Sequence, residues 1–535
     1  MNMLKKLAMG AAALVVLPAS AWAEWFEIRT DQFIVYSEAD RDEAVEFAQL
    51  LEKYDRAMRI TQNIPFEPAK SDAQRVTVFH WGDGQDIAEL ATGSRRAGVR
   101  GFYMPRAGQP VAFSPAEGES IRRAGSRQRS DRRTRLDRQS VLLHEYAHSF
   151  MLQHFPATYP QWYVEGFAEF YSQIDFLEDG SFHLGNPPQY RGDFLKRGPR
   201  YHIEQMFDTS SKVDAMDQAN WYSTGWLTLH YLTFAQDRQG QLADFLGRIQ
   251  KGERSLDAAK AAFGDLGQLN SDIRSYLKGD LLGYNVKPAN FDDPTVNVRE
   301  LSDAEEAVIE YRMRSWRGVD EKEARSIQSA LESRADLSTD SVLVAMTLAE
   351  AEFDAKNYDA AERAARRALA IDPSHSKASL YLGRISAKRA EQADEAQAGS
   401  GKPYWTEARA FFLDAVAADR NDPLPLYEYY QSFRDADEAP SQQALIALEN
   451  AYMLAPYDMG VRGTLVRQLA EEGKALLAAD LVTPLVFAPH SNEDVEQLRS
   501  AMEMIRAGQE QEGVEQMTAF FDRMEAEAEE EEKDS

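Results

Sequence analysis

The sequence predicts an α+β protein in which a small mixed β-sheet and a helical lobe precede an all-α domain of helix-turn-helix repeats. Three observations predict this architecture. Strand-like runs occur before residue 114, apolar residues follow helical spacing after about residue 138, and a proline-ended helical pattern recurs in the last third. At 535 residues the chain is too long for one core, so we expect two or three domains.

The strand-like runs lie at 33–36, 76–79 and 110–113 and are rich in β-branched and aromatic residues. Between the first two, segment 41–60 has an apolar stripe at helical spacing, made of Val45, Phe47, Ala48, Leu51 and Met58. We therefore expect a strand, a helix and a second strand in this order.

Segment 357–373 (NYDAAERAARRALAIDP) has the small-residue and leucine spacing of a helix that ends in a proline turn. Pro423, Pro456 and Pro489 then follow one another at intervals of 33 residues, a period typical of helix-turn-helix repeats. Residues 336–490 resemble the tetratricopeptide family, and a generic helical bundle is the alternative. The resemblance implies a concave surface that holds a protein partner.

The N-terminal segment 1–23 has the pattern of a cleaved signal peptide. Lys5 and Lys6 precede an apolar run at 7–17, and Ala21-Trp22-Ala23 offers a cleavage site. We expect export to a periplasm; a membrane anchor or a buried helix is the alternative. The predicted domains are a catalytic domain at 24–285, a helical linker at 286–335, a repeat domain at 336–524 and a disordered acidic tail at 525–535.

Charge and cysteine content exclude several functions. Acidic residues outnumber basic ones by 87 to 60, which disfavours a nucleic-acid partner. The chain has no cysteine, which excludes disulfides, a thiol nucleophile and thiolate-bound metal. The arginine-rich segment 120–138 is either a solvated loop or a basic rim that attracts an acidic substrate.

Residues 144–148 read HEYAH in a segment with the apolar spacing of a buried helix. His144 and His148 are four residues apart, so both imidazoles project from one helix face and can bind a single ion. Two histidines and a carboxylate suit Zn²⁺ with an open position for water. Glu145 is placed to take a proton from that water and pass it to the leaving amine.

A second helix is predicted at 160–173, with Glu165 in its apolar face. Its segment Trp162-Tyr163-Val164-Glu165-Gly166-Phe167-Ala168 matches the W-x-x-E-G-x-A motif of the gluzincin metallopeptidases, which include thermolysin-like enzymes. Residues 25–285 resemble this family, most closely its bacterial peptidase MA-like domains. The resemblance implies a gluzincin-like catalytic domain in which Glu165 completes the zinc site.

Two further residues compete as metal ligands. Glu169 lies one turn beyond Glu165 and could replace it, accept a hydrogen bond from a ligand histidine, or face solvent. His154 has the spacing of the third histidine in the metzincin pattern. Met151 stands where that pattern needs a helix-breaking glycine, which argues against His154.

The segment 221–232 (WYSTGWLTLHYL) is similar to the Y-x-K-G segment of aminopeptidase-type gluzincins, with Thr224 in place of the lysine. The resemblance implies that Tyr222 stabilises the oxyanion of the transition state; a core aromatic is the alternative. His230 is either another donor or structural. Segment 99–115 lacks the glutamate that binds a free N-terminus in aminopeptidases, so an endopeptidase is favoured.

These patterns together predict an exported zinc endopeptidase whose repeat domain recruits a protein substrate or partner. The alternative is a catalytically inactive periplasmic adaptor that works through its repeats. A third possibility is hydrolysis of another amide, such as a cell-wall peptide bridge.

Overall fold

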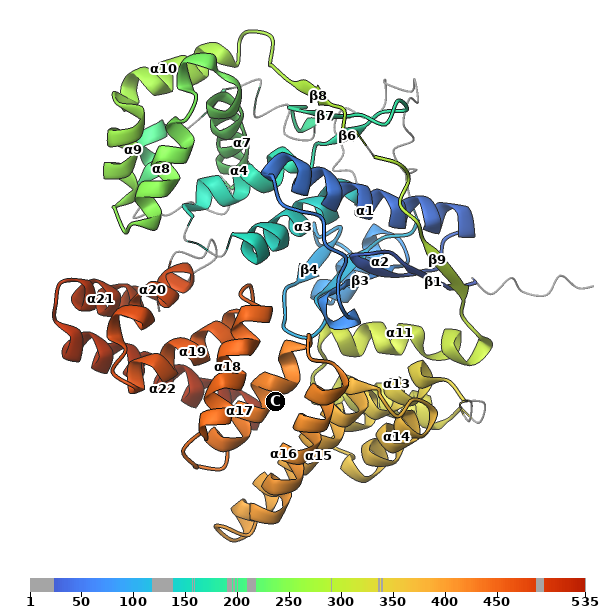
Figure 1. Ribbon diagram of the computed structural model, residues 1–535. Coiled ribbons are helices and arrows are strands. Elements are labelled where there is room, and N and C mark those ends of the chain that lie inside the picture. Colours follow the sequence, from blue (N-terminus) through green and yellow to red (C-terminus); the bar gives the residue numbers. More distant parts are fainter. Residues whose placement is uncertain are drawn as a thin grey trace, which may run out of the picture.

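The computed structural model describes residues 24–117, 138–155, 159–189, 201–208, 218–289, 291–334, 340–486 and 495–534, with isolated positions 157, 195, 198, 199 and 337. The predicted signal peptide and most of the arginine-rich segment lie outside these residues. The protein is mixed α+β, with a sheet in its first half and a helical repeat-like region after it (Figure 1).

The main sheet has six strands in the order β4-β5-β3-β2-β1-β9. Strands β2, β3 and β5 are parallel, and the outer pairs β4–β5, β2–β1 and β1–β9 are antiparallel. The strands are β1 (Phe26–Arg29), β2 (Phe33–Ser37), β3 (Val76–His80), β4 (Phe102–Met104), β5 (Val111–Ser114) and β9 (Asn297–Glu300). The three predicted strands are confirmed as β2, β3 and β5.

Helices cover both faces of this sheet because its residues are apolar on both sides. One face packs against α1 (Arg41–Gln62), which confirms the predicted helix, and α3 (Arg138–His154). The other face packs against α2 (Gly84–Thr92) and α11 (Asp303–Arg317). In Figure 1, α1 lies above the strands and α11 below them.

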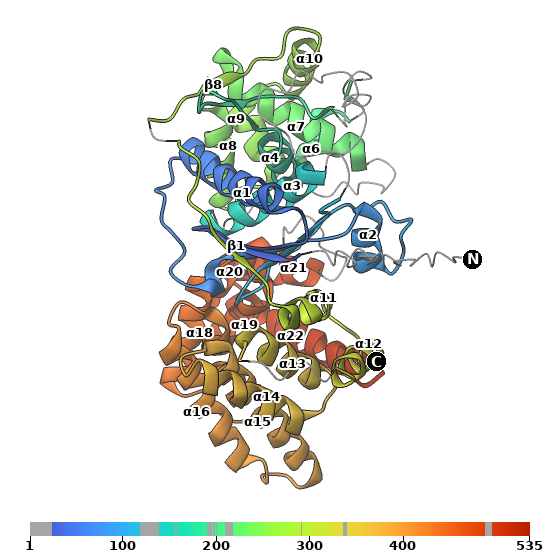
Figure 2. The same cartoon turned by 90° about the vertical axis from the view of Figure 1, so that its right-hand side faces the viewer.

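The helical lobe follows α3 in the chain and lies at the far end of the molecule from the repeats (Figure 2). It contains α4 (Gln161–Tyr171), α6 (Ile203–Phe207), α7 (Gln218–Phe234), α8 (Gln241–Gln250), α9 (Ser255–Phe263) and α10 (Leu266–Tyr276). A three-stranded sheet borders it, made of β6 (Asp175–Phe176), β7 (Phe182–Leu184) and β8 (Tyr284–Val286). The lobe shares one apolar core with α1 and α3.

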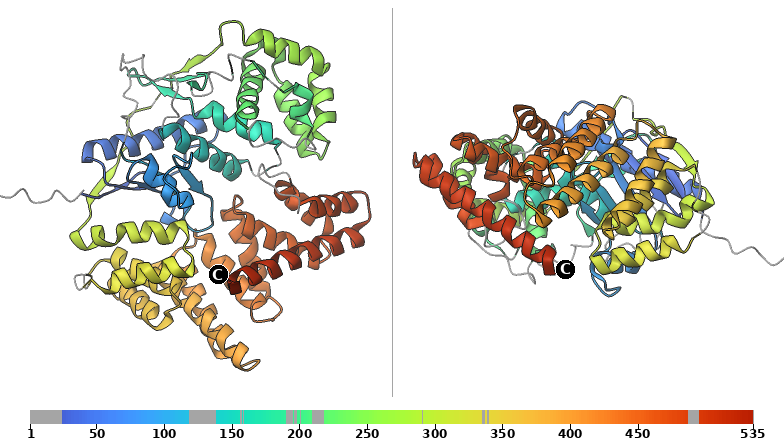
Figure 3. Two further views of the ribbon diagram at one scale, coloured as in Figure 1. Left: turned by 180° about the vertical axis from the view of Figure 1, so that it is seen from behind. Right: turned by 90° about the horizontal axis from the view of Figure 1, so that it is seen from below.

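From residue 321 onward the described chain is a series of helices, most of which pack against the next; we call this the repeat arm. Figure 3 shows it as an arc of helices. Pro373 and Pro456 lie in turns and Pro423 begins α17, whereas Pro489 lies outside the described residues. The helices are α12 (Glu321–Glu332), α13 (Val342–Asp354), α14 (Tyr358–Ile371), α15 (Ser376–Ala396), α16 (Lys402–Ala418), α17 (Pro423–Arg434), α18 (Gln442–Leu454), α19 (Met459–Glu471), α20 (Ala475–Val486), α21 (Val495–Arg506) and α22 (Glu510–Asp534).

Two predicted segments differ from their description. The segment 286–335 is not a helical linker throughout, because it contains β9, which pairs with β1 and completes the main sheet. The acidic tail 525–535 is not irregular, because α22 continues to Asp534. Alanine and glutamate both favour helix, so an existing helix continues through them. Among the described residues, no helix is both long and apolar enough to cross a membrane.

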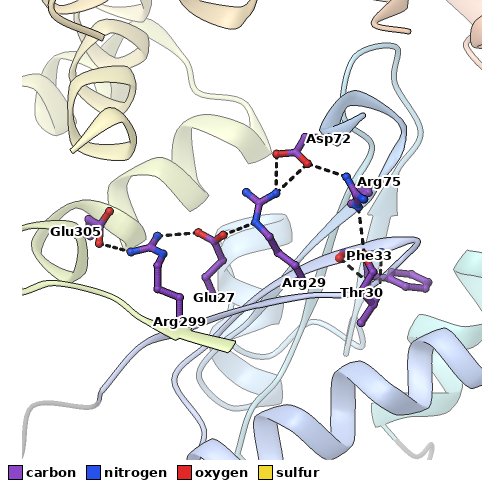
Figure 4. A network of polar contacts seen from close by, with 8 residues as sticks. All are labelled: Glu27, Arg29, Thr30, Phe33, Asp72, Arg75, Arg299 and Glu305. Carbon is purple, nitrogen blue, oxygen red and sulfur yellow. Dashed lines mark hydrogen bonds and ion pairs between the residues drawn. The ribbon is translucent and has the colours of Figure 1, made fainter. Parts of the chain in front are cut away.

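An ionic chain ties β9 to β1 and to the start of β3 (Figure 4). Arg299 bridges Glu305 and Glu27 at 2.7 and 2.8 Å, and Arg29 bridges Glu27 and Asp72 at 2.5 and 2.7 Å. Exposed ion pairs are weak singly, and a network fixes geometry better than separate pairs. The late strand is therefore attached to the sheet by side chains as well as by backbone.

Candidate metal centre

Helix α3 presents His144 and His148 side by side. Their spacing of four residues places both imidazoles on one face, and the two Nε2 atoms lie 3.1 Å apart. Both side chains are partly exposed, at 12% and 20%. The pair is therefore not fully sealed from solvent.

Helix α4 brings Glu165 to the same point. Its Oε2 lies 3.3 Å from His144 Nε2 and 3.6 Å from His148 Nε2, and its side chain is buried. These three residues form a group whose ligand atoms all lie within 4.8 Å of one another. Four ligands at Zn²⁺ bond lengths of about 2.0–2.1 Å in a tetrahedron are separated by roughly 3.3 Å. The observed spacings of 3.1–3.6 Å fit such a site.

The buried carboxylate oxygen is also suited to a cation. Glu165 Oε2 is buried and accepts no hydrogen bond of good geometry from the described residues. A buried charge is costly unless a positive group or an ion compensates it, and this oxygen lies where a cation between the two imidazoles would do so. The residues present therefore fit Zn²⁺.

The local charges favour the ionised carboxylate. Burial alone raises the pKa of Glu165, but His148 and His144 facing it hold that pKa below its usual value. Burial alone lowers the pKa of His144, whereas the carboxylates of Glu165, Glu169 and Glu145 raise that pKa to about 8. The site is thus strongly negative around its two histidines, which increases its attraction for a divalent cation.

Hydrogen bonds between α1 and α3 hold α3 in place; we call α3 the metal helix because it carries His144 and His148. The Tyr54 hydroxyl donates to the Leu143 carbonyl at 3.0 Å, and the Tyr146 hydroxyl donates to Asp55 Oδ1 at 2.7 Å. Asp55 in turn pairs with Arg59 at 2.6 Å. Sequence reasoning missed this set; an aspartate inside the apolar stripe of 41–60 was the available signal.

Two glycines let α4 and α7 cross closely next to the metal centre. A Cβ on Gly166 would lie 2.7 Å from the Gly225 carbonyl oxygen, and a Cβ on Gly225 would lie 2.7 Å from the Trp162 carbonyl oxygen. Tyr222 lies one turn before Gly225, with its ring centre 6.2 Å from that of His144. The crossing therefore places Glu165 and Tyr222 around the same histidine.

Gly166→Ala is expected to reduce the free energy of unfolding by about 1–3 kcal/mol, because the new methyl group meets backbone that cannot rotate away. The shift also moves the adjacent Glu165, so zinc affinity should fall. Urea unfolding and zinc titration measure the two effects. Gly247→Ala in α8 is the control, since a Cβ there meets nothing within 4 Å. The control should gain about 0.5–1 kcal/mol; equal behaviour of the two variants would contradict the close crossing.

The structure decides between several of the alternatives. Glu169 is fully buried, and its carboxylate raises the pKa of His144. The alternative that Glu169 faces solvent is therefore wrong. His154 is the last residue of α3, as expected if Met151 continues the helix, and it is outside the ligand group. Burial lowers the pKa of His154 to about 4.

His230 has a structural environment. It is fully buried in α7, with Nε2 3.1 Å from the Gly185 carbonyl oxygen and Nδ1 3.0 Å from the Tyr276 hydroxyl. Burial lowers the pKa of His230 to about 4. A neutral imidazole donating to the carbonyl and accepting from the phenol explains both contacts. The residue therefore links α7 to β7 and α10.

Strand β4 is a further neighbour of the metal helix that sequence reasoning missed. The Tyr103 hydroxyl lies 2.7 Å from the hydroxyl of Ser149, the residue that follows His148 in α3. No pattern in 99–115 indicated this contact, because β4 is only three residues long.

No protein-family model matches the chain, and no curated protein is similar to it in sequence. Among solved structures, the chain is similar to the MamA RS-1 ArsTM double mutant, with 16% identity over 37% of this chain and 98% of that chain, at a TM-score of 0.26.

Proposed function

We propose that this protein is a zinc-dependent peptidase of the gluzincin type, with an all-α arm that recruits a polypeptide. The observation that carries the proposal is the convergence of His144, His148 and Glu165 on one point at spacings of 3.1–3.6 Å. The residues fit Zn²⁺, which when bound polarises a carbonyl oxygen and makes water a better nucleophile.

Each remaining residue of the site has a proposed role. Glu145 lies between the two histidines in the sequence and is half-buried, so its carboxylate can take the proton of an attacking water and return it to the leaving amine. Tyr222 is placed beside His144 to donate a hydrogen bond to the oxygen that becomes negative in the transition state. Glu169 adds negative charge beside His144, which favours a cation at the site.

The substrate class and location follow from other parts of the chain. Segment 99–115 contains no glutamate to bind a free N-terminus, which favours an endopeptidase. The pattern of 1–23 favours export through a cleaved signal to a periplasm. The helical arm supports a second candidate function, that of an inactive periplasmic adaptor that binds proteins through its repeats.

The zinc content of the purified chain tests the proposal, with Glu165→Ala beside it. We expect about one tightly held Zn²⁺ per chain, and an affinity at least about 100-fold weaker in the variant, since it loses a ligand. Glu352→Ala is the control, because this buried glutamate belongs to α13 in the arm. Absence of zinc from the wild-type chain would overturn the proposed peptidase function and leave the adaptor function.

A further inference from the structure

The loop between β4 and β5 is unusual for the tip of a hairpin. Hairpin tips normally face solvent, yet Ala107, Gly108, Gln109 and Pro110 are all buried. Ala107 belongs to the apolar core of the repeat arm rather than to the core of the sheet. The loop therefore leaves its own domain and enters the arm.

The arm contacts the loop backbone at two helix starts. The Ala107 N–H donates to Asp458 Oδ2 at 2.6 Å, while Asp458 Oδ1 caps α19 by accepting from Val461 N. Gly108 has φ +69° and lies against the first turn of α17, where an added Cβ would meet Leu424 Cβ at 2.7 Å. The contact is thus too close for any residue with a side chain.

Charged and polar side chains flank these two contacts. Arg106 donates to the Trp316 carbonyl at 2.9 Å and lies over the indole ring, with Lys377 4.2 Å from the same ring. Lys377 also donates to Gln109 Oε1. Gln109 has φ +93°, a left-handed conformation that a non-glycine residue keeps only where its surroundings hold it.

The loop fills the groove that the arm's inner helices form. Residues of α13, α15, α17 and α19 line the cavity beside it, including Glu350, Tyr381, Arg384 and Tyr427. This cavity has a volume of about 260 Å³. Pockets for small ligands usually measure about 300–1,000 Å³, so this cavity between the loop and the four helices is smaller than a typical ligand pocket.

The docked loop is directly connected to the metal centre. Its strand β4 contacts α3 through the Tyr103 and Ser149 hydroxyl groups at 2.7 Å. Leu152, one turn beyond His148 in α3, packs against the apolar core of the arm. The arm therefore touches the metal helix directly and holds its neighbouring edge strand.

We propose that the inner groove of the repeat arm is a docking site for the chain's own loop at 105–110, and that the docked arm positions β4 and α3. The docking of the loop does not depend on the proposed metal function. The positioning of β4 and α3 does. Any other protein that the arm binds contacts it outside this part of the groove, and Asp458 and Gly108 are positioning residues.

Backbone amide hydrogen exchange on the full chain tests the docking. In Gly108→Ala, exchange in the β4–β5 loop and in the first turn of α19 should accelerate at least about tenfold. Gly93→Ala is the matched control, because Gly93 has φ +72° but a Cβ there meets nothing within 4 Å. Equal protection in the two variants would overturn the docking.

A second pair of variants tests the docking in case Gly108→Ala does not fold. Asp458→Asn keeps one oxygen for the α19 cap but cannot also accept from Ala107 N–H, so it should show the same acceleration. Asp320→Asn is its control, since Asp320 caps α12 through Glu323 N. Acceleration no larger in Asp458→Asn than in Asp320→Asn would again overturn the docking.

Visible absorption of the Co²⁺-loaded chain tests the positioning. We expect altered band positions or intensities in Gly108→Ala and Asp458→Asn, and the wild-type spectrum in both controls. Accelerated exchange with an unchanged spectrum would overturn positioning and keep docking. If no form binds Co²⁺ or Zn²⁺ while exchange changes as expected, docking holds and the proposed peptidase fails.

Discussion

Glu145→Gln is expected to slow peptide hydrolysis about 10²–10⁴-fold while the zinc content stays at the wild-type value. Glutamine has nearly the same shape as glutamate but cannot accept a proton from water. His144, His148 and Glu165 remain to hold the metal, so the variant should keep its zinc and lose hydrolysis. The measurements are zinc content and cleavage of a labelled, unfolded protein by the zinc-loaded chain.

Glu43→Gln provides the control for this prediction. Glu43 is also a half-buried helical glutamate, in the first turn of α1. Its variant should cleave at the wild-type rate. Full activity in Glu145→Gln would contradict the role of Glu145 as the base, whereas joint loss of zinc and activity would assign it to metal binding.

Asp55→Asn is expected to reduce the free energy of unfolding by about 3–5 kcal/mol. Asp55 and Arg59 are both buried and pair at 2.6 Å, and Tyr146 of the metal helix donates to the same carboxylate at 2.7 Å. Asparagine keeps the acceptor for Tyr146 but leaves the Arg59 charge buried without its partner. Urea unfolding followed by tryptophan fluorescence measures the loss.

The pair Asp244–Arg248 in α8 offers a matched comparison. It has the same i,i+4 spacing, but its side chains are 51% and 36% exposed. Asp244→Asn should therefore change stability by only about 0–1 kcal/mol. Similar losses in the two variants would show that burial does not decide the contribution of Asp55.

The pairing of His144 and His148 could be predicted because helical periodicity places residues four apart on one face. The approach of Glu165 to them depends on the packing of α4 against α3 and was implied only by the resemblance of its motif to the gluzincin motif. The strands β2, β3 and β5 could be predicted because their continuous apolar runs are typical of buried parallel strands.

The missed features depend on contacts between distant segments. Strands β1 (FEIR) and β9 (NVRE) carry charged residues and β4 is only three residues long, so none has the apolar run of β2, β3 and β5. The loop at Ala107 and Gly108 resembles an ordinary turn, and its burial depends on Asp458, some 350 residues later. Asp55 interrupts the apolar stripe of 41–60, but its hydrogen bond from Tyr146 depends on the packing of α3 against α1.

The position of β9 at the edge of the main sheet has a consequence for the order of folding. Strand β1 ends at Arg29, and the strand that covers its free edge begins at Asn297. At synthesis rates of roughly 5–20 residues per second, this interval lasts on the order of tens of seconds. During that time the edge of β1 is exposed to pairing with other chains. Until residues 297–300 pair with it, β1 therefore has one edge of unpaired backbone groups.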